Sequence, residues 1–205
     1  MNFGGAINGI AKHFLRWTVI AVAGLMISGC STTPVSLSYN PALAKQAAIM
    51  PVVEVNSVMD QREDTSNRIG AIRGGFGNPL KKLETPVPVK DVVRDTFVEG
   101  LRARGLLADG NTGTYGLQIG VKRLDSSQLV RREAHSKFDI SVIDKASGKH
   151  VYSKTAEDNR SDEGSLATGI LASTEDLRKI TNDSLQAAID QALDDIGFLT
   201  AIKAH

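Results

Sequence analysis

The sequence predicts a single α+β domain in which two helices cover one face of a largely antiparallel, mixed sheet of about five strands. Two segments, 87–105 and 173–196, repeat apolar residues at helical spacing and therefore predict amphipathic helices. Shorter segments rich in β-branched residues alternate apolar with polar side chains, as half-buried strands do. The order is strand, strand, helix, three strands, helix. Because each helix has one apolar stripe, both are expected on the same face of the sheet.

The N-terminal half of the domain contains two strand segments and a loop. Ala48–Met59 is apolar and rich in β-branched residues, which predicts a buried strand. Arg68–Arg73 predicts a second strand after the polar connection DQREDTSN. The segment GGFGNPLKKLETP, which begins at Gly74, has the Gly and Pro residues of a loop. The glycines of GAIRGGFG match neither GxGxxG nor a P-loop, and they predict a tight turn or bulge.

The first helix, 87–105, has a clear stripe and a clear end. Gly105 lies where a left-handed C-cap residue belongs, and Arg102 and Arg104 place positive charge in the last turn, where it suits the helix dipole. The stripe consists of Val89, Val92, Val93, Phe97 and Leu101.

Three strands and a helix complete the domain. The segments 115–124 and 136–144 alternate as half-buried strands, KASG at 145–148 predicts a turn, and 149–158 returns as the last strand. Ser173 and Asp176 resemble a capping box at the start of the second helix. Its expected buried side consists of Leu177, Ile180, Leu185, Ala188, Ile189, Ala192, Leu193 and Ile196.

The first thirty residues predict a lipoprotein signal peptide. Residues 1–17 carry two cations and no acid, and Thr18–Ser28 is uncharged, mostly apolar and shorter than the ~20 residues that a transmembrane helix needs. The stretch Ile27–Cys30 resembles a bacterial lipobox, which implies cleavage between Gly29 and Cys30 and acylation of Cys30, the only cysteine. Alternatively, Cys30 is a buried thiol in an uncleaved amphipathic or membrane-anchoring helix, but Pro34 would break such a helix.

The anchor sets the expected organisation and location of the protein. The expected parts are a signal peptide at 1–29, the lipidated Cys30 with a flexible tether at 30–46, a periplasmic domain at 47–200 and a tail at 201–205. Alternation in VSLSY also allows Val35, Leu37 and Tyr39 to lie on the domain as a short edge strand. Residue 31 is Ser rather than Asp, which resembles the sorting signal of Gram-negative outer-membrane lipoproteins. We therefore expect a lipid-anchored protein on the periplasmic side of the outer membrane.

The net charge and the cysteine content bear on the partners that the domain can have and on what stabilises its core. Removing residues 1–29 takes two of the 24 Lys and Arg residues, leaving 22 against 23 Asp and Glu, so the formal net charge changes from +1 to −1. A nearly neutral domain gives no reason to expect a nucleic-acid partner. With Cys30 lipidated, no thiol is left for a disulfide, so the domain must depend on an ordinary core.

Five sequence features together resemble the YajG-type family of small bacterial lipoproteins. They are the lipobox, a first strand ending in DQRED, the NRIG strand, a helix ending in LRARG and the strand YGLQIGV, and they extend over most of residues 30–200. The resemblance implies location and fold rather than activity, because this family is largely uncharacterised. The element order also resembles the N-terminal domain of TolB and the periplasmic lipoproteins that activate peptidoglycan synthases, an analogy of fold that carries no function.

Few residues are candidates for chemistry. In DQRED, Asp60, Glu63 and Asp64 could bind a hard cation or act as acid and base, whereas the alternative is that Asp60 pairs with Arg62 and holds the loop. The histidines left after cleavage, His135, His150 and His205, have no metal-ligand spacing. They are therefore expected on the surface.

Two further segments are candidates for binding. Arg131 and Arg132 could contact phosphate or an acidic partner, or could guard a solvated strand edge, and strand addition by a partner is expected near 128–136. The apolar, Gly-containing segment 164–174 predicts either a docking loop or part of the core.

The sequence thus favours a non-enzymatic binding or accessory domain without a cofactor. Its expected partners are membrane lipid, through the acylated Cys30, and an envelope protein or a peptidoglycan-associated molecule. The alternative function is a periplasmic metal-dependent hydrolase that uses Asp60 and Asp64, with His135 as a further candidate. Convergence of these three side chains in one cleft would favour the enzyme.

Overall fold

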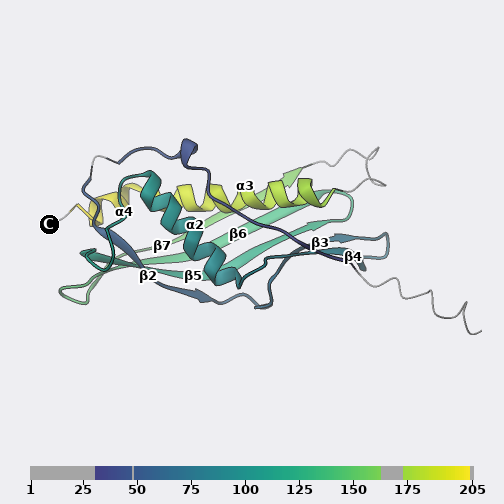
Figure 1. Cartoon of the computed structure of the whole chain (residues 1–205), viewed down its shortest axis with the longest axis horizontal. Helices are drawn as coiled ribbons and strands as arrows, with labels where there is room; N and C mark the ends of the chain where they lie inside the picture. Colours follow the sequence, from purple (N-terminus) through teal and green to yellow (C-terminus); the bar gives the residue numbers. More distant parts are fainter. Residues whose placement is uncertain (1–30, 48, 163–172, 204–205) are drawn as a thin grey trace, which may run out of the picture. The chain divides into compact units, whose positions relative to one another are not determined.

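Three long strands, β5 (Tyr115–Gln128), β6 (Arg132–Asp144) and β7 (His150–Asp162), form an antiparallel meander along the whole molecule (Figure 1). The chain can turn tightly between β6 and β7 because Gly148 adopts a φ of 70°, which L side chains rarely adopt. This computed structural model describes residues 31–47, 49–162 and 173–203. The predicted turn at 145–148 is confirmed.

Four more strands extend the sheet on the other side of β5. β2 (Val53–Asp60) pairs in parallel with the first half of β5, and β3 (Arg68–Arg73) pairs in parallel with its end. β4 (Pro79–Glu84) is antiparallel to β3, and β1 (Ser31–Pro34) is parallel to β4. The strand order is therefore β1-β4-β3-β5-β6-β7, with β2 also paired to β5.

The helices α2 (Val89–Ala103) and α3 (Thr174–Leu193) lie on the same face of the sheet (Figure 1). The Phe97 ring of α2 packs edge to face on Phe138 of β6 at 5.5 Å, while Ser184 of α3 donates a hydrogen bond to Ser136 on the same side of that strand. All five residues of the predicted α2 stripe are buried. A mixed seven-stranded sheet with helices packed on it confirms the predicted α+β fold class.

The structure has more strands than the sequence predicts. The segment after Gly74 was expected as a loop, yet β4 forms there and contributes the fully buried Leu83 to the core. Its two lysines and its proline interrupt the alternation that is typical of a strand. β4 is instead stabilised by pairing with β1 and β3, which the local sequence does not show. The predicted first strand also begins too early, since pairing starts only at Val53, after Pro51.

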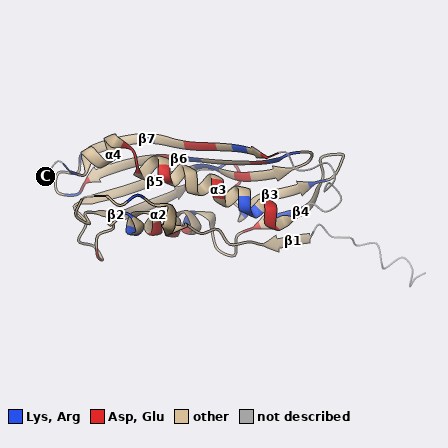
Figure 2. Ribbon diagram, turned by 90° about the horizontal axis from the view of Figure 1, so that it is seen from above, with Lys and Arg blue, Asp and Glu red and all other residues tan. Residues whose placement is uncertain are grey.

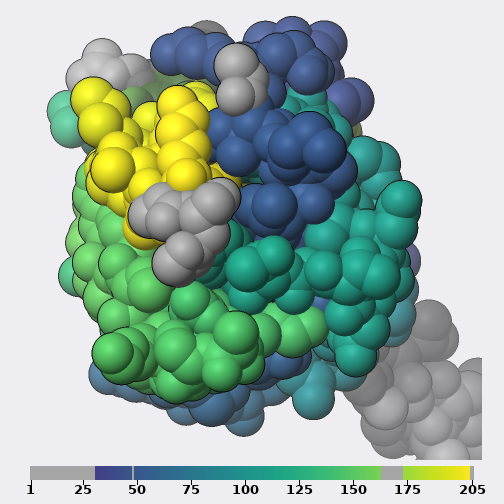
Figure 3. All heavy atoms as spheres, turned by 90° about the vertical axis from the view of Figure 1, so that its left-hand side faces the viewer, coloured from purple at the N-terminus to yellow at the C-terminus, as the bar shows by residue number. Residues whose placement is uncertain are grey.

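The ends of the helices follow the capping chemistry. Ser173 Oγ accepts hydrogen bonds from the amides of Glu175 and Asp176, as the capping motif predicts. The prediction that Ile196 continues this helix and is buried is wrong. α3 ends at Leu193, Asp195 caps the short helix α4 (Ile196–Ala201), and Ile196 is 81% exposed at that end of the molecule, which Figure 3 faces.

The segment 31–46, expected to be a tether, lies along the domain. Its first residues form β1, and Val35, Leu37 and Tyr39 are buried in the core. The 3₁₀ turn η1 (Pro41–Leu43) follows, and Gln186 of α3 accepts a hydrogen bond from the Asn40 amide. Apolar alternation therefore dominates over the turn-forming composition of the segment. The predicted signal peptide, with Gly29 and the lipidation site Cys30, lies outside the described residues.

A buried arginine joins this segment to both helices. Arg104, which caps α2 and is 1% exposed, donates to Asp190 Oδ1 at 2.8 Å and to Asp194 Oδ1 at 2.7 Å at the end of α3. It also donates to the Tyr39 hydroxyl at 2.6 Å, which itself donates to Asp190. Burial and the bond to Asp190 raise the pKa of Tyr39 to about 12. The hydroxyl therefore stays protonated and can donate at neutral pH.

We expect Arg104→Met to lower the free energy of unfolding by ~3–5 kcal/mol, because two carboxylates would lose their buried counter-charge. Urea unfolding followed by circular dichroism measures the loss. The control is Arg102→Met, which removes only the exposed ion pair with Glu99 and should change stability by less than ~1 kcal/mol. Equal effects of the two substitutions would contradict a central role for Arg104.

Candidate functional site

A hollow in the surface lies where β5 changes its neighbour. β2 pairs with β5 as far as Val121, and β3 pairs with it from Ser126 onward. Among the described strands, residues 122–125 therefore have only β6 beside them. A hollow of about 590 Å³ opens at this interruption, closed on one side by the loop that connects β2 to β3.

Charged side chains of both signs surround the hollow. Its lining carries five cationic side chains and three carboxylates; these are Arg62, Arg68, Arg73, Lys122 and Arg123, and Glu63, Asp64 and Asp125. Two more carboxylates, Asp60 and Asp139, pair with Arg62 and Lys122 from outside the lining, so an acidic group of a partner would bind there by replacing a carboxylate of the protein.

The buried arginine of the lining is held by the loop itself. Arg62 donates from Nε and Nη2 to the two oxygens of Asp60 at 2.9 and 2.8 Å, and it also binds the backbone carbonyls of Ser66 and Arg68. This confirms the predicted alternative, in which the pair holds the loop at the strand end. Burial alone would raise the pKa of Asp60, but the bonds from Arg62 outweigh it and lower this pKa below its ordinary value.

Asp64 also has its own partners. It accepts from the Ser66 amide at 3.0 Å and from Arg68 at 2.5 Å, and these bonds, those with Ser66 first, lower its pKa. His135 does not line the hollow; it lies on β6 opposite Asp125, and its Nδ1 is 2.6 Å from Asn159 Oδ1 of β7. Within the described ranges no group of three or more His, Cys, Asp or Glu residues could hold a metal ion. The structure thus does not bring the three candidates for an enzyme together there.

The other cationic side chains of the hollow form exposed, weak interactions. Arg123 pairs with Asp125 at 2.6 Å and Lys122 with Asp139 at 3.5 Å, all with side chains more than 40% exposed. Arg73 donates to the Gly77 carbonyl. Because exposed ion pairs contribute only ~0–1 kcal/mol, these cations can exchange their present partners for a ligand at little cost.

Only one indirect sign in the sequence points to the meeting of these residues, namely Gly70 in β3. Gly70 is the residue at which β3 comes against β5, and a Cβ there would lie 2.4 Å from Ser126 Oγ. The pairing of β3 with β4 shifts register between Arg68 and Gly70, within the glycine-containing stretch for which a turn or bulge was predicted. A second register shift lies between Val121 and Arg123, where β5 pairs with β6 beside the hollow.

The two predicted binding arginines have different surroundings. Arg132 bridges Asp162 of β7 at 2.8 Å and Asp176 of α3 at 2.9 Å, whereas Arg131 is exposed in the β5–β6 turn. The prediction of strand addition near 128–136 is wrong, because β5 and β6 have strand neighbours on both sides there. Most of the predicted docking segment 164–174 lies outside the described residues.

None of the helices in the described part of the chain combines the length and the apolar character that a membrane span needs.

The outer strand β7 has a contact with α3 at its edge. The side chain of Gln191 on α3 accepts a hydrogen bond from the Glu157 amide of β7 at 2.7 Å. A partner strand would have to displace this contact to pair with β7.

Comparisons with known proteins show the fold. No family model and no curated protein matches the chain. Protein XCC0632 from Xanthomonas campestris, of the family DUF330, is 17% identical over 84% of this chain and 95% of that chain, with a TM-score of 0.56. PelC from Paraburkholderia phytofirmans, a dodecamer, is 14% identical over 72% and 92%, with a TM-score of 0.37. Lipoprotein GNA1162 from Neisseria meningitidis is 11% identical over 72% and 100%, with a TM-score of 0.31. The chain therefore shares its fold with XCC0632.

We expect Asp60→Asn to lower the free energy of unfolding by ~3 kcal/mol at neutral pH, because Arg62 would be left buried without its counter-charge. The carboxylate's contribution is present above its ordinary pKa of ~3.9 and is lost as the pH falls toward the lowered folded value. The substitution should therefore also make stability less dependent on pH below ~4. Urea titrations at several pH values measure both effects.

Asp64→Asn is the matched control, since its ion pair with Arg68 is almost half exposed and should contribute less than ~1 kcal/mol. If Asp60→Asn were as mild as this control, the Asp60–Arg62 pair would not be what holds the loop.

Proposed function

We propose that the protein is a lipid-anchored, non-enzymatic accessory protein of the bacterial envelope, similar to the YajG-type lipoproteins. In this proposal it is held on the periplasmic side of the outer membrane. One observation carries the proposal: the lipobox-like stretch Ile27–Cys30 stands directly before Ser31, where strand β1 begins. An acyl group on Cys30 would therefore be one residue away from the sheet, and the domain would stay close to the membrane.

The geometry gives the hydrolase less support than the accessory role. Asp60 and Asp64 are both occupied by guanidinium groups, which compete with a cation for the same oxygens. The hollow beside them instead offers exposed cations that can be shared with a partner. The proposed partner is an envelope protein or a peptidoglycan-associated molecule with acidic groups.

Tethering supplies the mechanism. A diacylglycerol thioether together with an N-acyl chain would hold the protein far more firmly than one acyl chain, because each buried methylene contributes ~0.8 kcal/mol. Confinement to a thin layer raises the effective concentration of the hollow near its partner, so that modest affinity is sufficient.

The anchor is tested by Cys30→Ser in cells that are supplied with a fatty-acid analogue. We expect the variant to lose the label completely and to keep residues 1–29, because no thiol is left to acylate. Ser31→Asp is the control: it should retain the label but move to the inner-membrane fraction. Label on Cys30→Ser would refute the anchor, and an unchanged distribution of Ser31→Asp would refute the outer-membrane assignment.

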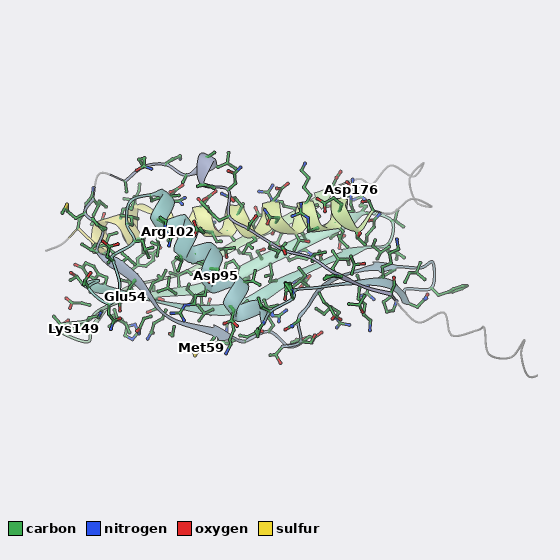
Figure 4. The ribbon with its side chains drawn as sticks, viewed as in Figure 1. Glu54, Met59, Asp95, Arg102, Lys149 and Asp176 are labelled. Carbon is green, nitrogen blue, oxygen red and sulfur yellow. The ribbon has the colours of Figure 1, made fainter. Side chains whose placement is uncertain are left out.

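The partner site is tested by a photo-crosslinking amino acid at position 123, at the hollow. A position at the far end of the molecule, Lys149, serves as the control (Figure 4). In intact cells we expect position 123 to yield a discrete product by mass spectrometry, and Lys122→Glu to reduce it several-fold. Equal products from both positions would show that the hollow is not the binding site.

A further inference from the structure

Three chain segments meet at one end of the molecule. The β3–β4 turn follows Ile72, which pairs with Gln128, so the β5–β6 turn begins at the same level. β1 starts there too, because Ser31 pairs with Lys81 near the start of β4. Figures 1 and 2 show β3 and β4 at the end opposite α4, and Figure 2 places β1 beside them.

Both turns present apolar side chains to solvent. Phe76 is 102% exposed at the tip of the β3–β4 turn, and Leu80, Leu129 and Val130 are more than half exposed. The tip consists of Gly74, Gly75, Phe76 and Gly77, and no atom lies within 4 Å of a Cβ built on Gly75 or Gly77. The ring therefore has no packing role in the domain, although burying it elsewhere would contribute ~1.5–3 kcal/mol.

The two segments that carry these side chains contain only positive charge. The segments 73–83 and 128–132 contain five cations and no carboxylate, namely Arg73, Lys81, Lys82, Arg131 and Arg132. Asp162 and Asp176 neutralise Arg132 from outside the two segments, and the net charge of this end stays positive without it. Each Lys or Arg near an anionic lipid surface is worth ~1 kcal/mol.

We propose that this end of the domain, with Phe76, Leu129 and Val130 of the two turns and Leu80 at the start of β4, inserts its side chains into an anionic phospholipid surface. The proposal rests on the proposed function, because the lipid on Cys30 would bring Ser31, and with it both turns, to the membrane. Apolar tips surrounded by cations have the chemistry of interfacial membrane contacts. At the opposite end, the exposed Ile196 directly follows two carboxylates, Asp194 and Asp195.

A single tryptophan tests the contact in the full-length lipidated protein. The only native tryptophan, Trp17, would be removed with the signal peptide, so Phe76→Trp would make a mature protein with one reporter. In vesicles of phosphatidylethanolamine and phosphatidylglycerol we expect its emission to shift to the blue and to be quenched by brominated phospholipid. Ile196→Trp, the control at the far end, should show neither change. Adding Lys81→Gln and Lys82→Gln to Phe76→Trp should reduce the shift.

The outcomes separate this inference from the proposed function. Mass spectrometry of the same sample reports the acyl groups directly. If the Phe76→Trp protein is acylated and its emission is unchanged in vesicles, the membrane contact alone is overturned. If it has no acyl group, the anchor is overturned and Trp17 is retained in both proteins; stronger quenching of Phe76→Trp than of Ile196→Trp then supports the contact, and equal quenching overturns it. A blue shift that needs no vesicles and grows with protein concentration indicates a second copy of the chain, and overturns the contact with lipid.

Discussion

The arrangement of the helices α2 and α3 and of the N-terminal segment 31–46 depends on one buried cation, Arg104. Burying Arg104 without its partners would cost several kcal/mol, because its charge would be removed from water without compensation. Asp190 and Asp194 come from the end of α3, and the Tyr39 hydroxyl comes from the segment that follows β1. All three segments must therefore reach the same point for this charge to be compensated. This links the segment next to the predicted anchor directly to the core.

Local pattern predicted most of the helices and central strands. The stripe of α2, the cap of α3 and the alternation of β5, β6 and β7 all depend on residues close in the sequence. β1 and β4 were not found, because they are short and pair with each other across about fifty residues of chain, while β4 also pairs with the neighbouring strand β3. The alternation of Val35, Leu37 and Tyr39 allowed this segment to lie on the domain, but its partners on α3 could not be predicted, because Asn182 and Gln186 lie near the other end of the sequence.

The candidate site likewise combines a feature that the local sequence predicts with one that depends on strand pairing. The Asp60–Arg62 pair joins residues two apart at a strand end, so the sequence alone could suggest it. The hollow could not be foreseen, because it depends on where β2 leaves β5 and where β3 joins it. Arg73 comes from β3, whereas Lys122 and Arg123 come from β5, and only the pairing of these two strands brings them to the same hollow.

The direction of β1 has a mechanical consequence. β1 runs parallel to β4 and away from the end where the chain leaves toward Cys30. Tension applied at that point acts along the strand axis, and its hydrogen bonds to β4 run across this axis. The bonds are then loaded together in shear rather than peeled apart one after another. Behind them, the buried side chains of Val35, Leu37 and Tyr39 would have to leave the core before the strand could slide.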